Sequence, residues 1–134
     1  MKRRRQSADM YHEAFQELNE LDLPLANEGE EGTTHSWHLY VIRLNLQQLQ
    51  IDRNKFIDEL RRKGIGTSVH FIPLHIHPYY RETYGYQPDD FPVTYETYKR
   101  IISLPIYAKM SDGDVERVVE AVKDVITLYR KGGK

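Results

Sequence analysis

The chain has 134 residues, and its 19 basic and 20 acidic side chains give a formal net charge of −1. A balanced charge creates no field that would attract a polyanion, so nucleic acid is not an expected partner. No apolar run approaches the ~20 residues that span a bilayer, and no cysteine is present for a disulfide or a thiolate metal site. These features predict one globular, cytoplasmic domain without a membrane partner.

The first predicted element is an amphipathic helix over about residues 4–21. Its apolar side chains recur at spacings of three and four, at Ala8, Tyr11, Ala14, Phe15, Leu18 and Leu21. No capping residue precedes the helix, so we expect the chain to enter a longer helix partway along. Pro24 ends the segment, and an acidic loop follows at residues 27–34.

The run HSWHLYVIRL, residues 35–44, predicts the central strand. A period of two leaves both of its faces largely apolar, as a strand that is covered on both sides requires. The run TSVHFIPLH, residues 67–75, is the expected pairing partner of this strand. We expect the remaining elements to wrap around the pair.

A capped helix is predicted between these two runs, over about residues 53–63. Asp52 is a good N-cap, and Ile51 can pack on Phe56 as a hydrophobic staple. Gly64 provides the C-terminal stop.

Four prolines interrupt residues 73–92, which predicts little long regular structure there. We expect a short helix near residues 78–84, then a loop, and a further helix over about residues 95–102. A third strand is predicted at residues 103–107, with Pro105 placing it at an edge or an end of the sheet.

The last predicted element is the clearest helix of the sequence. Ser111 and Asp114 form an Asp variant of the capping box, Met110 can pack on Val115, and an apolar stripe follows. The predicted order is α-β-α-β-α-α-β-α. It indicates an α/β fold with a small sheet of about three strands, antiparallel or mixed, on which the helices pack.

Five of the six histidines fall in two short runs, His35 and His38 in one and His70, His75 and His77 in the other. A metal site needs three ligands at a fixed geometry with supporting partners, and this spacing does not provide them, so no metal is predicted. Loop or interface positions remain open for these histidines. Substrate contacts or proton handling near a cleft remain open as well.

The aromatic series of the proline-rich region also has two interpretations. Tyr79, Tyr80, Tyr84, Tyr86 and Phe91 are either packing beneath a loop or part of an interface. Acid–base pairs and a hydrolase triad are not evident from the spacing, so the residues alone indicate a cleft edge and no complete active site.

Three segments together resemble a known family: HSWHLYVIRL, then RRKGIGTSVHFIPLHIHPYYRETYGY, then DFPVTYETYKRIISLPIYAKMSDGDVERVVEAV. In this order they are similar to the C-terminal small domain of the DegT/DnrJ/EryC1/StrS sugar aminotransferases. The resemblance covers about residues 5–128. It implies a single domain over residues 1–134, with residues 1–24 as the linking helix and residues 35–130 as the α/β core.

The resemblance implies a fold and an activity for the parent enzyme. That enzyme would be a homodimer of the type I aminotransferase fold that uses pyridoxal phosphate (PLP) to move an amino group from an amino acid to a keto sugar nucleotide. In this family the Schiff-base lysine and the cofactor contacts come chiefly from a large domain, which is absent here. We therefore expect no catalytic residue in this chain, no bound PLP and no activity when it is alone.

The HFIPLH segment matches the family segment near the mouth of the active site. The resemblance thus implies that His70, Phe71 and His75 line the substrate side of the cleft. The alternative is a stand-alone binding or oligomerisation module that kept this domain and lost catalysis.

Overall fold

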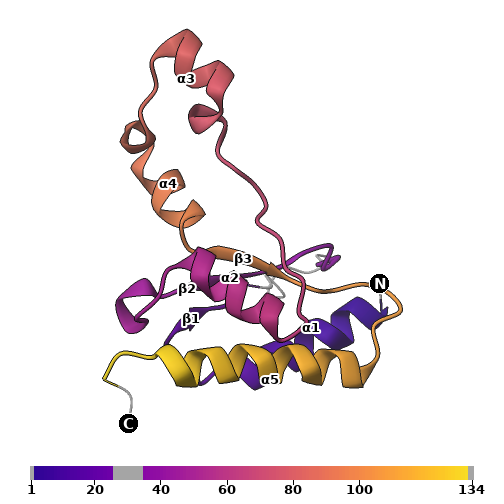
Figure 1. Cartoon of the computed structure of the whole chain (residues 1–134). Helices are drawn as coiled ribbons and strands as arrows, with labels where there is room; N and C mark the ends of the chain where they lie inside the picture. Colours follow the sequence, from indigo (N-terminus) through magenta and orange to yellow (C-terminus); the bar gives the residue numbers. More distant parts are fainter. Residues whose placement is uncertain (1, 26–34, 133–134) are drawn as a thin grey trace.

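The computed structural model describes residues 2–25 and 35–132, and the predicted acidic loop at residues 27–34 lies outside the described residues. The described chain forms a body, built from a sheet and three helices, and an arm of residues 69–99 that projects from it (Figure 1). No helix among the described residues is long and apolar enough to cross a membrane.

The sheet has three strands, and all of its pairings are antiparallel. In spatial order they are β1 (Leu21–Asp22), β2 (Tyr40–Leu44) and β3 (Ile101–Leu104). In the register, Leu21 lies opposite Leu44 in the first pair, and Ile42 lies opposite Ile102 in the second. The predicted α/β fold with a small sheet of about three strands is therefore confirmed, as is the central position of β2.

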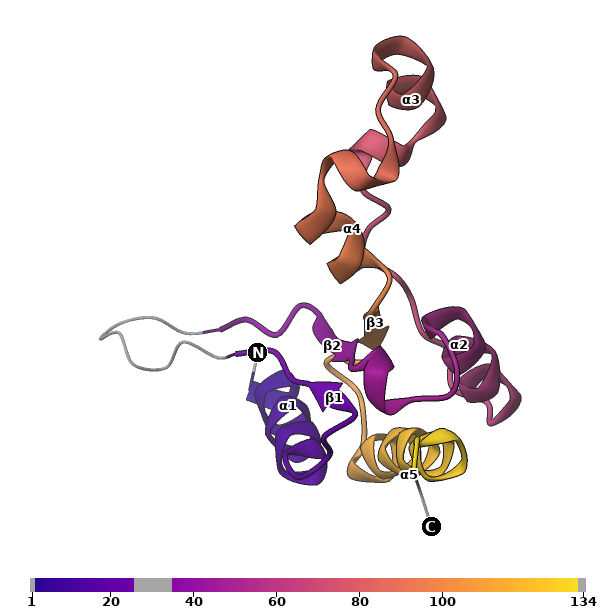
Figure 2. The ribbon, with the colours of Figure 1, turned by 90° about the vertical axis from the view of Figure 1, so that its left-hand side faces the viewer.

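The body helices cover the apolar face of this sheet. Helices α1 (Lys2–Phe15) and α5 (Asp112–Tyr129) contact one another and lie together on one side of the sheet, whereas the arm projects away from the other side (Figure 2). Helix α2 (Arg53–Arg62) packs against α5 and β3. The core between these layers is closed, because its large side chains are fully buried: Tyr11, Phe15, Tyr40, Ile42, Leu44, Phe56, Leu60, Val115, Val122, Val125 and Ile126.

Two tyrosines of the core, Tyr11 and Tyr40, have hydroxyl groups that lie between the helices and the sheet. The hydroxyl of Tyr11 donates to the carbonyl oxygen of Pro105 at 2.6 Å, and its ring lies 4.8 Å from that of Tyr40. Burial raises the pKa of both phenols, so they stay protonated. Each therefore keeps a hydroxyl that can donate a hydrogen bond inside the core.

The central strand is shorter and more one-sided than the sequence predicts. It begins at Tyr40, because Trp37 has a φ of 51° and its backbone N–H donates to Nδ1 of His35 in a local turn. Along β2 the burial alternates, and Arg43 is exposed. Only one face of the strand is fully covered, so the expectation of two covered faces is wrong.

The prediction that residues 67–75 pair with the central strand is also wrong. Within residues 67–75 only Ser68 joins the sheet, through a single bridge to Ser103 on the outer side of β3. The chain then leaves the sheet towards the arm. The neighbours of β2 are β1 and β3, and the two-residue strand β1 gave no periodic signal.

Three other boundaries differ from the sequence prediction. Helix α1 ends at Phe15, and Leu21 pairs in the sheet, although its spacing also fits the helix. Helix α4 (Pro92–Tyr98) begins earlier than predicted because Pro92 takes the first turn, where a missing N–H costs nothing. Strand β3 ends before Pro105, which has no N–H for the ladder. The observed order is α-β-β-α-α-α-β-α.

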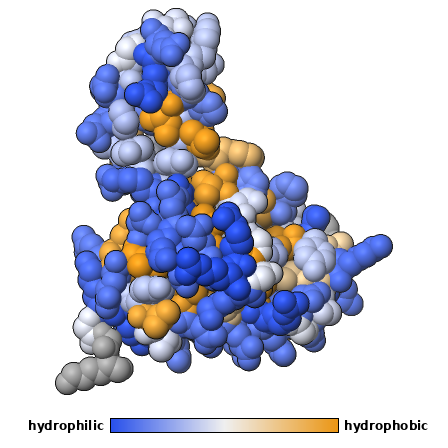
Figure 3. Space-filling model, in the orientation of Figure 1, coloured by the Kyte–Doolittle hydropathy of each residue, from blue (hydrophilic) through white to orange (hydrophobic). Residues whose placement is uncertain are grey.

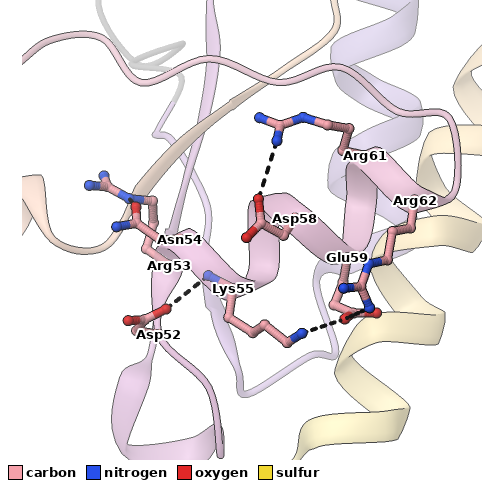
Figure 4. Close-up of polar contacts among 8 residues, drawn as sticks. All are labelled: Asp52, Arg53, Asn54, Lys55, Asp58, Glu59, Arg61 and Arg62. Atoms are coloured by element: carbon pink, nitrogen blue, oxygen red, sulfur yellow. Dashed lines mark hydrogen bonds and ion pairs between the residues drawn. The ribbon is translucent and has the colours of Figure 1, made fainter.

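Both predicted helix caps are present. The side chain of Asp52 accepts from the backbone N–H of Lys55 at 2.8 Å (Figure 4). Ser111 and Asp114 form the reciprocal capping box of α5. The predicted short helix is also confirmed, as α3 (Pro78–Tyr84).

Helix α2 buries a carboxylate between two cations. Glu59 is 8% exposed, and its oxygen Oε1 lies 3.0 Å from Nζ of Lys55 and 3.1 Å from Nη1 of Arg62 (Figure 4). The hydrogen bond from Lys55 lowers the pKa of Glu59, and the backbone hydrogen bond from Ser111 lowers the pKa of Asp114. Both carboxylates are therefore stabilised in their charged form by folding.

These lowered pKa values predict acid sensitivity. The unfolded chain takes up protons before the folded chain does, so the stabilisation is complete above about pH 4.5 and is lost as the pH falls through the folded values. We expect the urea midpoint to fall between pH 6 and pH 3. Glu59→Gln and Lys55→Met should each flatten this dependence, and an unchanged slope in both variants would contradict the assignment.

Candidate functional site

Two of the predicted site residues lie together where the arm leaves the sheet. Nδ1 of His70 is 2.8 Å from the hydroxyl of Ser103 on β3, and the His70 ring meets the ring of Phe71 edge-on at 4.7 Å. Phe71 is 74% exposed. The sheet therefore fixes the orientation of His70, while Phe71 presents an apolar ring to the surroundings.

The third predicted residue, His75, lies further along, inside the arm. It is buried, and its Nε2–H donates to the carbonyl oxygen of Pro88 at 3.0 Å. Its ring also contacts that of Phe91 at 4.8 Å. His75 thus joins the outgoing limb of the arm, on which it lies, to the returning limb, which contains Pro88 and Phe91. The structure does not place His75 beside His70.

A pocket of about 610 Å³ opens in the arm next to His75. Its walls are mainly apolar and aromatic, with Leu74, Tyr80, Tyr84, Tyr86 and Phe91 among the lining residues. The rings of Tyr80, Tyr84, Tyr86 and Phe91 follow one another at centroid distances of 5.6–6.1 Å. The tyrosines of the proline-rich region therefore pack on one another and also remain open to the surface.

Two arginines attach the returning limb of the arm to the body. Nη1 of Arg53 donates to the carbonyl oxygens of Tyr98 at 2.6 Å and Ile101 at 3.3 Å, and its guanidinium lies 4.7 Å from the centre of the Tyr98 ring. Nε of Arg100 donates to the carbonyl oxygen of Leu44 at 2.7 Å, and Arg100 pairs with Asp22. Arg53 thus fixes the end of the arm to helix α2, and Arg100, directly after the arm, fixes the chain to strands β1 and β2.

These anchoring residues are not predicted from the sequence. Arg53 had one signal, because a cation in the first turn of a helix opposes the helix dipole and needs another reason to be there. Its side chain is only 7% exposed, and the carbonyls it satisfies supply that reason. Arg100 and Ser103 had no such signal in the sequence.

The described residues do not fit a PLP site. No lysine in the described part of the chain is buried, and Lys55, Lys63 and Lys99 pair with carboxylates. The hydrogen bond with Glu96 raises the pKa of Lys99, which opposes the neutral amine that a Schiff base requires. Within the described ranges no three His, Asp or Glu side chains are grouped to bind a metal.

The sequence of this chain matches a known protein family. The family model described as the DegT/DnrJ/EryC1/StrS aminotransferase family matches residues 1–123. This chain belongs to that family. The match includes the sheet, the arm and most of α5, so the candidate site lies within the family domain.

Two proteins that are similar in sequence are much longer than this chain. It is 50% identical over 129 residues to the uncharacterised protein MJ1066 of Methanocaldococcus jannaschii, which covers 96% of this chain and 33% of that protein. It is 45% identical over 126 residues to the spore coat polysaccharide biosynthesis protein SpsC of Bacillus subtilis, covering 93% and 32%. The chain therefore spans about a third of the length of these relatives.

A solved structure of a relative has the same fold. The putative sugar aminotransferase Spr1654 of Streptococcus pneumoniae, in its PMP form, is 30% identical and matches with a TM-score of 0.80. The match covers 93% of this chain and 30% of Spr1654. It therefore includes most of the arm as well as the body, because 7% of this chain is far shorter than the 31 residues from 69 to 99.

We expect the anchoring role of Arg53 to appear in stability and amide exchange. Arg53→Leu should lower the free energy of unfolding by about 2 kcal/mol, because two carbonyls lose a charged donor. Amide exchange should rise more in α4 than in α5. Arg61→Leu on the same helix is the control, since its exposed ion pair with Asp58 is worth less than about 1 kcal/mol. Equal effects of the two substitutions would contradict this role.

Proposed function

We propose that this chain is the C-terminal small domain of a PLP-dependent nucleotide-sugar aminotransferase. The parent enzyme would move an amino group from an amino acid donor to a keto sugar nucleotide. The main support for this proposal is the family match over nearly the whole chain, together with the shared fold of Spr1654. Spr1654 has been solved in PLP and PMP forms, the two cofactor forms that an amino-group transfer interconverts.

The cofactor would be bound by a large domain outside this chain. Two observations support that division: the chain spans about a third of its relatives, and the lysines of the described residues are exposed or paired with carboxylates. The parent enzyme would act as a homodimer, and this domain would be inactive alone. When bound, PLP would supply the electron sink of the reaction, and none of that chemistry would pass through the residues described here.

Within that enzyme, the base of the arm would close the substrate side of the cleft. Phe71 would exclude water with its exposed ring. Nε2 of His70 has no hydrogen-bond partner in the described part of the chain, and the ring is oriented through Ser103. That nitrogen would contact the sugar nucleotide. His75 would contribute by setting the shape of the arm beside the cleft.

The expected inactivity of the chain alone can be tested with PLP and borohydride. We expect no stoichiometric, saturable lysine adduct after incubation with PLP and reduction, because no lysine in the described part of the chain is buried. Peptide mapping by mass spectrometry would measure it, with Spr1654 as the positive control. A single lysine modified to one equivalent at saturation would contradict the proposal that PLP is bound outside this chain.

The substrate-side role predicts a binding defect for Phe71→Ala. The test protein is Spr1654 in which this chain replaces the matching segment. Loss of the apolar contact should raise KM for the accepted sugar nucleotide about tenfold with little change in kcat. Leu128→Ala, at a 65% exposed position on α5, is the matched control. Unchanged kinetics for Phe71→Ala would remove it from the site.

A stand-alone binding or oligomerisation module is the second candidate. It is favoured by the closed core of the body, which needs no further domain to bury its apolar side chains. This module would self-associate through the aromatic part of the arm and bind a sugar nucleotide without turnover. A strict monomer in light scattering at micromolar concentration, with no sugar-nucleotide binding, would contradict it.

A further inference from the structure

Ser103 is the only polar residue of strand β3, which otherwise consists of Ile101, Ile102 and Leu104. It is 5% exposed, and its hydroxyl has one hydrogen-bond partner among the described residues, Nδ1 of His70 at 2.8 Å. A buried hydroxyl without a partner destabilises a fold, so this contact accounts for a serine at an otherwise apolar position. The same contact determines which nitrogen of the His70 ring carries the proton.

The backbone holds these two side chains together where the arm leaves the sheet. Ser103 and Ser68 exchange two backbone hydrogen bonds, at 2.8 Å and 3.2 Å, and His70 follows Ser68 by two residues. The ring of Phe71 meets the His70 ring edge-on at 4.7 Å. Figure 3 shows apolar surface at the junction of the arm with the body. A hydrogen bond made from this ring is therefore less open to competition from water than one on a polar surface.

The hydroxyl of Ser103 and the neutral imidazole of His70 each have one proton to donate, which allows two arrangements. If Nδ1 carries the ring proton, it donates to the hydroxyl, and the buried hydroxyl proton has no acceptor among the described residues. If Nε2 carries the ring proton, the hydroxyl donates to Nδ1, and Nε2–H remains available to another group. Only the second arrangement satisfies the buried donor, so it is the more stable one.

We propose that Ser103 is a positioning residue that keeps the proton of the neutral His70 ring on Nε2, so that the ring donates a hydrogen bond to an acceptor oxygen of the sugar nucleotide. This rests on the proposed function, because it takes His70 to lie on the substrate side of the cleft. A protonated Nε2 has no lone pair to accept a proton, so His70 binds its ligand and does not act as a base towards it. The acceptor is a phosphoryl oxygen or an oxygen of the sugar.

Nitrogen NMR of the isolated chain tests the position of the proton directly. In the ¹⁵N-labelled chain at about pH 9, above the ordinary titration range of imidazole, long-range ¹H–¹⁵N spectra distinguish protonated from unprotonated ring nitrogens. The His70 signals are assigned from their loss in His70→Gln. We expect a protonated Nε2 and an unprotonated Nδ1 in the unmodified chain. A ring protonated on Nδ1, or an equal mixture of the two forms, would overturn the proposal.

Substitutions of Ser103 show whether its hydroxyl is the cause. Ser103→Ala should raise the fraction of the Nδ1-protonated form several-fold, whereas Ser103→Thr keeps a hydroxyl and should give the spectrum of the unmodified chain. Ser68→Ala is the matched control, because Ser68 contacts Ser103 through backbone atoms. An unchanged spectrum in Ser103→Ala would contradict the positioning role. The unmodified chain decides the position of the proton even when Ser103→Ala does not fold.

Kinetics of the Spr1654 chimera test donation to the substrate. An asparagine amide reaches the place of Nδ1 but not that of Nε2, so His70→Asn keeps a polar group beside Ser103 and removes the outward donor. We expect His70→Asn to raise KM for the accepted sugar nucleotide about tenfold with little change in kcat. Unchanged KM would contradict donation.

Inhibition of the chimera by the free nucleoside diphosphate identifies the acceptor oxygen. An equal rise in its inhibition constant in His70→Asn assigns the hydrogen bond to a phosphoryl oxygen, and a rise confined to KM assigns it to the sugar. The NMR experiment needs no turnover, so failure of the proposed aminotransferase activity would be seen separately. An active chimera together with a His70 ring protonated on Nδ1 would contradict this inference alone.

Discussion

The contacts of Ser103 connect the sheet, the arm and the candidate site. Its backbone pairs with Ser68 at the start of the arm, and it lies opposite Val41 of β2 in the ladder. Its hydroxyl contacts His70. Because β3 is completely buried, these contacts are held in one geometry. A small shift of this strand would move His70, the outgoing limb and, through the carbonyl of Ile101, the contact with Arg53.

The arm consequently has polar contacts at its base and an apolar surface. Its polar base satisfies backbone groups of Tyr98 and Ser68. Its apolar surface is not needed to complete the core of the body. This separation explains how a body with a filled core and an open pocket in the arm occur in one chain of 134 residues. It also places His70 and Phe71 at the boundary between the two.

Elements that depend on neighbouring residues are predicted well from the sequence. Elements that depend on pairing between distant segments are predicted poorly. The caps at Asp52 and Ser111 and the helix at residues 78–84 depend on neighbouring residues, and they are confirmed. Strand β1 is too short for a periodic pattern, and the turn at Trp37 depends on a contact with His35. The positions of His70 and His75 follow from the path of the arm, which no spacing encodes.

The mass of the native polypeptide that carries this sequence would show whether this domain is part of a longer enzyme. An antibody against an exposed segment of α5 would be used on a lysate of the source organism. We expect a band about three times heavier than 15.9 kDa, because the chain spans about a third of its relatives. A band at 15.9 kDa would contradict it, and would mean that the chain acts as a solitary module.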